Sequence, residues 1–230
     1  MRSSATIRQA DRLDDVAYVS PMVAFLAITL LASSWPAGYP ILYVVKTILA
    51  AGLLLTFRRR YARVRWDFAA LGAVAGVVGI VQWIGVDKLV LQVAPNYPRI
   101  TGDAFDPFAS IHPQWLAWSF VAVRWAGASL VVPFMEEFFW RDYVWRTIIA
   151  PNNFFLARIG EWDAMAFFVV AGAFACEHPQ WPTAIVYGLL IGGLLLYTRS
   201  LGACIICHAV TNFLLGAYVL WSNPRQWQYW

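Results

Sequence analysis

The stretch FAALGAVAGVVGIVQWIGV, residues 68–86, contains no Asp, Glu, Lys or Arg, and Gln82 is its one strongly polar side chain. An α-helix of this length is about 28 Å long at ~1.5 Å per residue, close to the ~30 Å hydrocarbon core of a bilayer. An uncharged apolar run of this length is typical of a transmembrane helix. We therefore predict a membrane span at about 67–86.

The composition of the whole chain extends this prediction to further spans. The 230 residues are 60% hydrophobic and 13% charged, whereas soluble domains are about 25% charged and 45–50% apolar. The surplus apolar surface must face lipid. We predict an all-α, polytopic transmembrane helical bundle of about seven to eight helices, forming a single membrane-embedded domain over 1–230, with spans at roughly 20–35, 39–57, 67–86, 115–135, 163–177, 182–197 and 202–221.

The basic segment RRRYARVR, residues 58–65, lies between two predicted spans and predicts the orientation. Loops rich in Lys and Arg stay in the cytoplasm, which places the N-terminus inside and the 87–114 loop outside. A basic cluster between two spans also argues against nucleic acid as a partner. The polar segment 1–19 carries acidic residues and no small-residue cleavage site follows it, so we expect an uncleaved anchor rather than a signal or transit peptide.

Charged residues emerge directly from an apolar run in VVPFMEEFFWRDY, residues 131–143. A charge at mid-bilayer costs at least ~2.5–3.5 kcal/mol, so it is usually paired or functional. Glu137 and Arg141 stand at i,i+4 and can form an ion pair on one helix face. Glu136 points about 100° away and is left free to act as a general base. A charged helix end at the interface would give the same pattern, as would an extension of this span through 138–150.

A histidine ends another apolar run in FACEHPQW, residues 174–181. Pro179 lacks an N–H and stops the helix, so His178 is delivered at a helix end. The similar stretch FASIHPQW, residues 108–115, follows a loop rich in turn formers. There we expect Pro-Gln-Trp to mark the entry into the fourth span, and His112 to be structural.

His208 and Asn212 stand at i,i+4 in CIICHAVTNFLLGAY, so they project from the same face of an apolar helix. The predicted topology places Glu136 toward the cytoplasmic side and His178 toward the outer end of the fifth span. The fifth and sixth spans are short, since 15 or 16 helical residues cover only about 22–24 Å. The turn between them can therefore lie below the membrane surface. Glu136 and His178 can meet only if a predicted boundary is wrong or the helices tilt and break.

Three motifs in order carry a resemblance to a known family. The sequence is similar to the CAAX-protease and bacteriocin-processing family of intramembrane proteases over about 133–215. The chain length and the aromatic and charged segment EEFFWRDYVWR most resemble a bacterial branch of this family that is associated with exosortase systems. The motifs are Glu136-Glu137-x-x-x-Arg141, Phe174-x-x-x-His178 and His208-x-x-x-Asn212.

The resemblance implies a glutamate-type intramembrane endopeptidase that requires no cofactor. Glu136 and His178 would activate a water for attack on a peptide carbonyl. His208 and Asn212 would hold that water or stabilise the oxyanion, which is usually a large catalytic contribution.

The same resemblance implies partners and a location. Glu137 and Arg141 would shape the site. A protein or peptide substrate, the lipid bilayer and a sorting or processing system are the partners implied. The branch implies a bacterial inner membrane.

Two metal-containing sites are alternatives. His178, His208 and Glu136 could bind zinc as a His₂Glu set with an open position, although no H-E-x-x-H motif is present. Cys204 and Cys207 precede His208 in the C-x-x-C-H pattern of haem attachment, but here the pattern lies inside an apolar span. Cysteines in such helices are usually packing residues, and we expect no structural disulfide.

A non-catalytic scaffold or transporter is the alternative from another functional class. Lys46 and Arg124 lie within predicted spans and could line a pathway. Such residues more often pair with a carboxylate across the bundle or extend toward the interface. The hydropathy shows no inverted repeat, which weakens the transporter hypothesis.

Overall fold

The computed structural model describes residues 8–99, 104–222 and 224–230, and within these ranges the chain is helical with no strand. Six helical stretches are long and apolar enough to cross a membrane: α1 (Arg12–Ser34), Pro36–Thr56 with α2 (Tyr39–Thr56), α3 (Ala69–Val93), Gln114–Ile149, α9 (Trp181–Thr198) and α10 (Leu201–Trp221). The apolar helix α8 (Ala164–Ala175) is shorter. The predicted all-α membrane bundle is confirmed.

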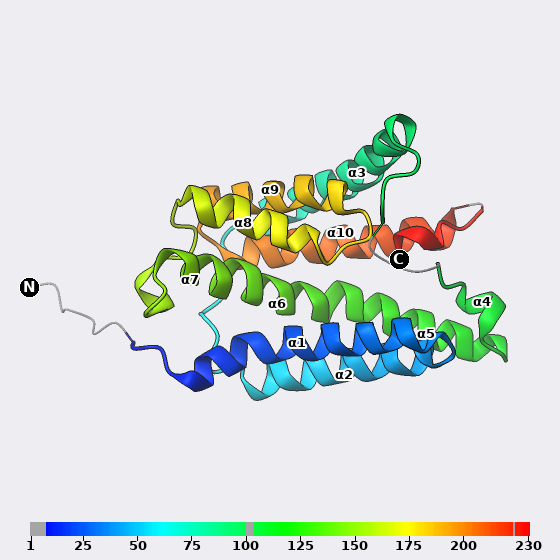
Figure 1. Cartoon of the computed structure of the whole chain (residues 1–230), viewed down its shortest axis with the longest axis horizontal. Coiled ribbons are helices and arrows are strands. Elements are labelled where there is room, and N and C mark those ends of the chain that lie inside the picture. The colour runs from blue at the N-terminus through cyan, green and yellow to red at the C-terminus, as the bar shows by residue number, and fades with distance from the viewer. Residues whose placement is uncertain (1–7, 100–103, 223) are drawn as a thin grey trace, which may run out of the picture.

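The helices form two layers, which Figure 1 shows one above the other. One layer contains α1, α2 and the long helical stretch Gln114–Ile149, which begins with α5 (Gln114–Ala126) after the short helix α4 (Pro107–Ser110). The other contains α3, α8, α9 and α10, with α10 packed against both α3 and α9. The N- and C-terminal ends lie at opposite ends of the bundle (Figure 1).

The first, third and fourth predicted spans differ most in extent from the helices, and α3 continues to Val93 rather than ending near 86. α1 begins at Arg12 rather than near 20, because Asp11 caps it: the Asp11 side chain accepts from the Asp14 N–H, and the Asp14 side chain accepts in return. Arg60 also donates to Asp11, and this hydrogen bond lowers the pKa of the Asp11 carboxyl. The fourth span extends to Ile149, so the segment 138–150 continues this helix.

Large apolar side chains remain uncovered along the outer faces of the helices. Leu30 is 70% exposed, Val81 69% and Tyr197 79%. An uncovered apolar belt on long helices is the surface that hydrocarbon tails cover. The surplus of apolar residues in the sequence is therefore placed where lipid can cover it.

The layer that contains α10 is held together by a close approach of two backbones. A Cβ added to Gly72 would lie 2.5 Å from the Ala203 carbonyl oxygen, and one added to Gly76 would lie 2.6 Å from the Cys207 carbonyl oxygen. Gly-x-x-x-Gly spacing places both glycines on one face of α3, where small residues let membrane helices pack closely. This contact fixes the height of α10 and hence of His208.

Replacement of Gly76 by leucine is expected to lower the free energy of unfolding by about 1–3 kcal/mol, because the side chain must push α3 away from α10. Gly85 on the same helix has nothing within 4 Å of an added Cβ, so Gly85→Leu is the matched control. Thermal unfolding in detergent measures both. Equal stability of the two variants would contradict the close packing of α3 against α10.

Candidate active site

Glu136 is the last residue of a short α-helical turn that lies between two π-helical segments of the long helix. The segment Gly127–Val131 is π-helical, α6 (Val132–Glu136) is one α-helical turn, Glu137–Val144 is π-helical again, and α7 (Trp145–Ile149) completes the stretch. Pro133 has no N–H to donate to the preceding turn, which explains why the regular hydrogen-bond ladder is interrupted there. π-helical turns of this kind occur frequently at functional sites.

Glu137 and Arg141 form the predicted i,i+4 ion pair. The Arg141 guanidinium lies 3.3 Å from Glu137 Oε1, and both side chains are completely buried. The Arg141 guanidinium also lies 4.6 Å from the centre of the Phe174 ring on α8. The pair therefore joins the long helix to the helix that leads to His178.

His208 lies between the two adjacent glutamates. Its Nδ1 is 2.9 Å from Glu137 Oε1, and its Nε2 is 4.0 Å from Glu136 Oε2. An Nδ1–H that donates to a carboxylate fixes the tautomer and the ring orientation. The Nε2 atom then faces Glu136 across a gap that one water can bridge. The two carboxylates thus have different positions relative to His208, as their 100° separation on the helix predicts.

His178 lies in the turn between α8 and α9, which ends short of the right-hand ends of α3 and α10 in Figure 1. Its Nδ1 is 2.9 Å from the Phe174 carbonyl oxygen, which leaves Nε2 free. The ring packs against Phe174 and against Trp83 on α3, at centroid distances of 4.4 Å and 5.4 Å. The shortness of α8 removes the conflict between the expected depths of Glu136 and His178.

Asn212 lies one turn beyond His208 on α10. Its Nδ2 donates to the Ala128 carbonyl oxygen at 2.9 Å, within the first π-helical segment. The irregular turn leaves the Ala128 carbonyl oxygen available to accept this hydrogen bond. The bond fixes the orientation of the Asn212 amide and does not involve its Oδ1. Asn212 therefore ties α10 to the long helix at its first π-helical segment.

A cavity of about 740 Å³ brings the four predicted catalytic residues together: Glu136, His178, His208 and Asn212 all line it. Glu137 and Arg141 are not among its lining residues and lie behind it. The lining continues through Ser33, Pro36 and Phe105 to the end of the bundle near the C-terminus. The cavity thus combines a carboxylate, two imidazoles and an amide within the membrane-spanning part of the chain.

Three further residues of the cavity wall have no place in the sequence prediction. Glu177 precedes His178 and lines the cavity, and its charge at the end of an apolar run was a usable signal. Trp83 and Tyr187 also line it, and their rings pack edge to face at 5.5 Å. In the sequence these two aromatic residues are indistinguishable from ordinary members of apolar spans.

Asp142 belongs to the same charged cluster in the sequence but is not among the residues that line the cavity. It is buried, accepts a hydrogen bond of 2.6 Å from the Tyr18 hydroxyl, and pairs with Arg146. Since Tyr18 is on α1, this contact holds α1 against the long helix. Asp142 is therefore a packing residue of the bundle.

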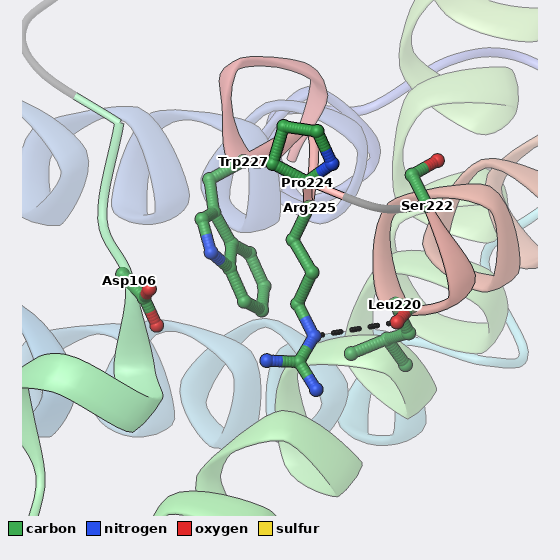
Figure 2. Close-up of a pocket in the computed structure, with 6 residues that line it drawn as sticks. All are labelled: Asp106, Leu220, Ser222, Pro224, Arg225 and Trp227. Atoms are coloured by element: carbon green, nitrogen blue, oxygen red, sulfur yellow. Dashed lines mark hydrogen bonds between the residues drawn. The ribbon is translucent and has the colours of Figure 1, made fainter.

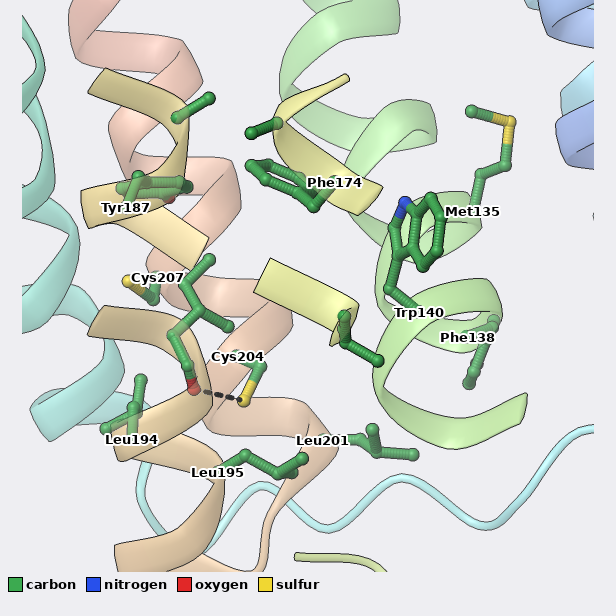
Figure 3. Close-up of a cluster of buried hydrophobic side chains, with 14 of the residues drawn as sticks. Met135, Phe138, Trp140, Phe174, Tyr187, Leu194, Leu195, Leu201, Cys204 and Cys207 are labelled. Atoms are coloured by element: carbon green, nitrogen blue, oxygen red, sulfur yellow. Dashed lines mark hydrogen bonds between the residues drawn. The ribbon is translucent and has the colours of Figure 1, made fainter. Parts of the chain in front are cut away.

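The core beside the cavity is formed by side chains from the long helix, α8, α9 and α10. Figure 3 shows Trp140 and Phe174 near one another, with Cys204 and Cys207 deeper between α9 and α10. The Cys204 thiol lies 3.8 Å from the Ile191 carbonyl oxygen, and the thiols of Cys176, Cys204 and Cys207 are free. Both cysteines of the C-x-x-C-H pattern are fully buried packing residues.

His112 does not share the environment of His178. It is exposed, does not line the 740 Å³ cavity, and precedes α5, which begins at Gln114. Both Pro-Gln-Trp sequences mark the start of a helix, since α5 begins at Gln114 and α9 begins at Trp181.

A separate cavity of about 480 Å³ lies near the C-terminal end, where Arg225 donates to the Leu220 carbonyl oxygen at 3.3 Å (Figure 2). It contains none of the predicted site residues.

The zinc alternative requires three ligands that converge on one point. Among the described residues, no group of three or more His, Cys, Asp or Glu side chains is arranged so that it could hold a metal ion. Glu136 and His208 lie near one another, and the His208 nitrogen on the other side of the ring is hydrogen-bonded to Glu137. The predicted His₂Glu zinc set therefore stays an alternative for experiment.

The comparisons with known proteins agree with the motifs. Residues 115–214 match the family described as type II CAAX prenyl endopeptidase Rce1-like. The matched segment includes all six predicted site residues, and it confirms the resemblance to the CAAX-protease family. No curated protein and no solved structure matches the chain. Together, the match and the six long apolar helices support an integral membrane protein of the protease class.

Proposed function

From the family match of residues 115–214, we propose that this chain is a glutamate-type intramembrane endopeptidase, which hydrolyses a peptide bond of a protein or peptide substrate without a metal ion. One observation carries the proposal. His208 lies between Glu136 and Glu137 at the wall of a cavity that His178 and Asn212 also line.

In the first step a water between Glu136 and His208 attacks the carbonyl carbon of the scissile peptide bond. Glu136 takes one proton from the water, and His208 Nε2 accepts a hydrogen bond from the other. Glu137 holds His208 in the required tautomer through Nδ1. The new C–O bond converts the carbonyl into a tetrahedral oxyanion.

In the second step the C–N bond breaks, and the proton held by Glu136 passes to the leaving amine. The second N–H of Asn212 can donate to the oxyanion. His178, whose Nδ1–H donates to the Phe174 carbonyl oxygen, presents Nε2 as a hydrogen-bond acceptor for the attacking water or the leaving amine. The products are a new carboxylic acid, which keeps the second proton of the water until it ionises to a carboxylate, and a new amine; Glu136 is again ionised.

We propose that the N-terminus is cytoplasmic, in the inner membrane of a bacterium. The segment between α2 and α3, which contains the basic loop 58–65, lies at the end of the bundle where α1 begins (Figure 1). So do the segment between α7 and α8, which contains Arg158, and the segment between α9 and α10, which contains Arg199. The cavity then opens toward the opposite, outer side. An exosortase-type sorting system as partner stays a prediction from the sequence.

The two histidines of the cavity give a direct test with a matched control. We expect His178→Gln and His208→Gln each to lower the rate of peptide cleavage by about a hundredfold or more, since positioned acid–base groups contribute 10²–10⁴-fold. His112→Gln changes the same residue type in the similar FASIHPQW stretch and should leave the rate unchanged. Cleavage of a farnesylated CAAX peptide in lipid nanodiscs, followed by mass spectrometry, measures all three. Full activity of either cavity variant would remove that histidine from the mechanism.

The zinc alternative predicts a different response to metal removal. The protein is dialysed against a strong chelator until elemental analysis shows less than about one zinc per ten chains. A glutamate-type enzyme should then keep its full cleavage rate. Loss of activity that zinc restores would replace the glutamate mechanism by a metal-dependent one.

A further inference from the structure

Two buried cations line the same cavity on the side of the N-terminal helices. Lys46 on α2 is 7% exposed and Arg124 on α5 is 5% exposed, and both belong to the cavity wall. Cations inside a membrane bundle are usually paired with carboxylates, because an unpaired buried charge costs several kcal/mol. Neither has a carboxylate partner among the described residues.

The contacts of these cations are aromatic rings and one hydroxyl. Lys46 Nζ donates to the Thr29 hydroxyl at 2.9 Å and lies 4.6 Å from the centre of the Tyr43 ring. The Arg124 guanidinium lies 5.3 Å from the same ring and 5.0 Å from that of Trp230. Two like charges thus share one aromatic ring, and Arg124 Nε and Nη1 have no hydrogen-bond partner within the described chain. An anion between Lys46 and Arg124 would offset the repulsion of the two cations and would accept hydrogen bonds from the unpartnered Arg124 nitrogens.

The depth of the pair favours a peptide over a lipid headgroup. Lys46 is about 10 Å from the start of α2, near the middle of the 21-residue stretch Pro36–Thr56, and Arg124 contacts the same Tyr43 ring. Headgroup phosphates lie at the membrane surface, above this level. A peptide that reaches Glu136 through the cavity passes the two cations.

The geometry points to an anion subsite, formed by Lys46 and Arg124, that binds a carboxylate of the peptide substrate on one side of the scissile bond. Arg124 and Glu136 are separated by roughly 18 Å along the helix. An extended peptide covers this distance in roughly five residues. The subsite rests on the proposed function, and it gives α2, which lies outside the matched segment, a role in substrate choice.

A binding experiment separates this inference from the question of cleavage. The probes are a soluble hexapeptide with a free C-terminal carboxylate, the same peptide as its C-terminal amide, and an amide with an aspartate at the last position. Binding is measured to the Glu136→Gln protein in phosphatidylcholine nanodiscs, so that no probe is hydrolysed. At least one carboxylate probe should bind about tenfold more tightly than the neutral amide, as charge-assisted hydrogen bonds predict. Which of the two does so identifies the source of the carboxylate.

Variants of the cations complete the test. Lys46→Met and Arg124→Met should abolish the preference for the carboxylate, whereas Lys46→Arg and the exposed control Lys88→Met should retain it. The Lys46→Met protein should also unfold at an unchanged or higher temperature, because it no longer buries an unpaired charge. This excludes misfolding as the cause of the lost preference.

Three results would overturn the inference. The first is equal binding of all three peptides, and the second is a preference that persists in Lys46→Met and Arg124→Met together. The third is competition by phosphatidylglycerol in the nanodisc that depends on these cations while the carboxylate peptides show no advantage, which would assign the subsite to lipid. Cleavage is measured with the unsubstituted protein, which keeps Glu136. If the anion subsite is refuted, the proposed protease activity is therefore unaffected.

Discussion

Replacement of Glu136 by glutamine is expected to lower the rate of peptide cleavage by about a thousandfold while the protein keeps its fold. Glutamine has the shape of glutamate but cannot accept the proton of the attacking water, and a general base contributes about 10²–10⁴-fold. Glu136 Oε2 has no hydrogen-bond partner among the described residues, so the substitution breaks no hydrogen bond of that oxygen. The loss should therefore appear in kcat rather than in the unfolding temperature.

The matched control for this variant is Asp67→Asn, which makes the same carboxylate-to-amide change at an exposed position that pairs with Arg65. Both proteins are compared with the unchanged chain for cleavage of the farnesylated CAAX peptide and for thermal unfolding. Asp67→Asn should keep full activity. If Glu136→Gln cleaves at the unchanged rate, Glu136 is not the base and the proposed mechanism fails.

Replacement of Arg141 by methionine is expected to have the largest effect on stability. It leaves the fully buried Glu137 with the hydrogen bond to His208 but without a cation, and removal of one partner of a buried ion pair costs about 3–5 kcal/mol. The variant also loses the contact between the guanidinium and the Phe174 ring. Its unfolding temperature should fall well below that of the exposed control Arg158→Met.

The double variant Glu137→Gln with Arg141→Met separates the ion pair from packing. It no longer contains an unpaired buried carboxylate, so a large part of the lost stability should return. Activity should not return, because His208 no longer has a carboxylate at Nδ1. A double variant as unstable as Arg141→Met would show that the cost arises from lost packing of the guanidinium, rather than from the uncompensated charge.

Interactions within one helix could be predicted from the sequence. The Glu137–Arg141 pair follows from i,i+4 spacing alone. The predicted shortness of the fifth span is confirmed by α8, whereas the depth of the following turn below the membrane surface stays a prediction. The family motifs added that the three elements meet. The helix that carries Glu136 was predicted to end near 135 because the charges after it resemble a helix end; in the structure they are buried and paired, so the helix continues.

Contacts between helices required the structure. Glu137 and His208 are 71 positions apart, and nothing local in either segment places the Nδ1 of the imidazole at one glutamate and its Nε2 at the other. The hydrogen bond from Asn212 to Ala128 depends on a π-helical turn, which no local pattern predicts. Lys46 and Arg124 were expected to pair with carboxylates or reach the interface, whereas they share the Tyr43 ring inside the cavity.

The most direct test of the proposed mechanism is an experimental structure of the unsubstituted protein in a lipid nanodisc, at a resolution that shows ordered water. We predict one water within about 2.6–3.2 Å of both a Glu136 carboxylate oxygen and His208 Nε2, with His178 Nε2 and Asn212 facing the space beside it. A direct hydrogen bond between Glu136 and His208 that leaves no room for water, or a His178 side chain turned out of the cavity, would contradict the proposed hydrolytic site.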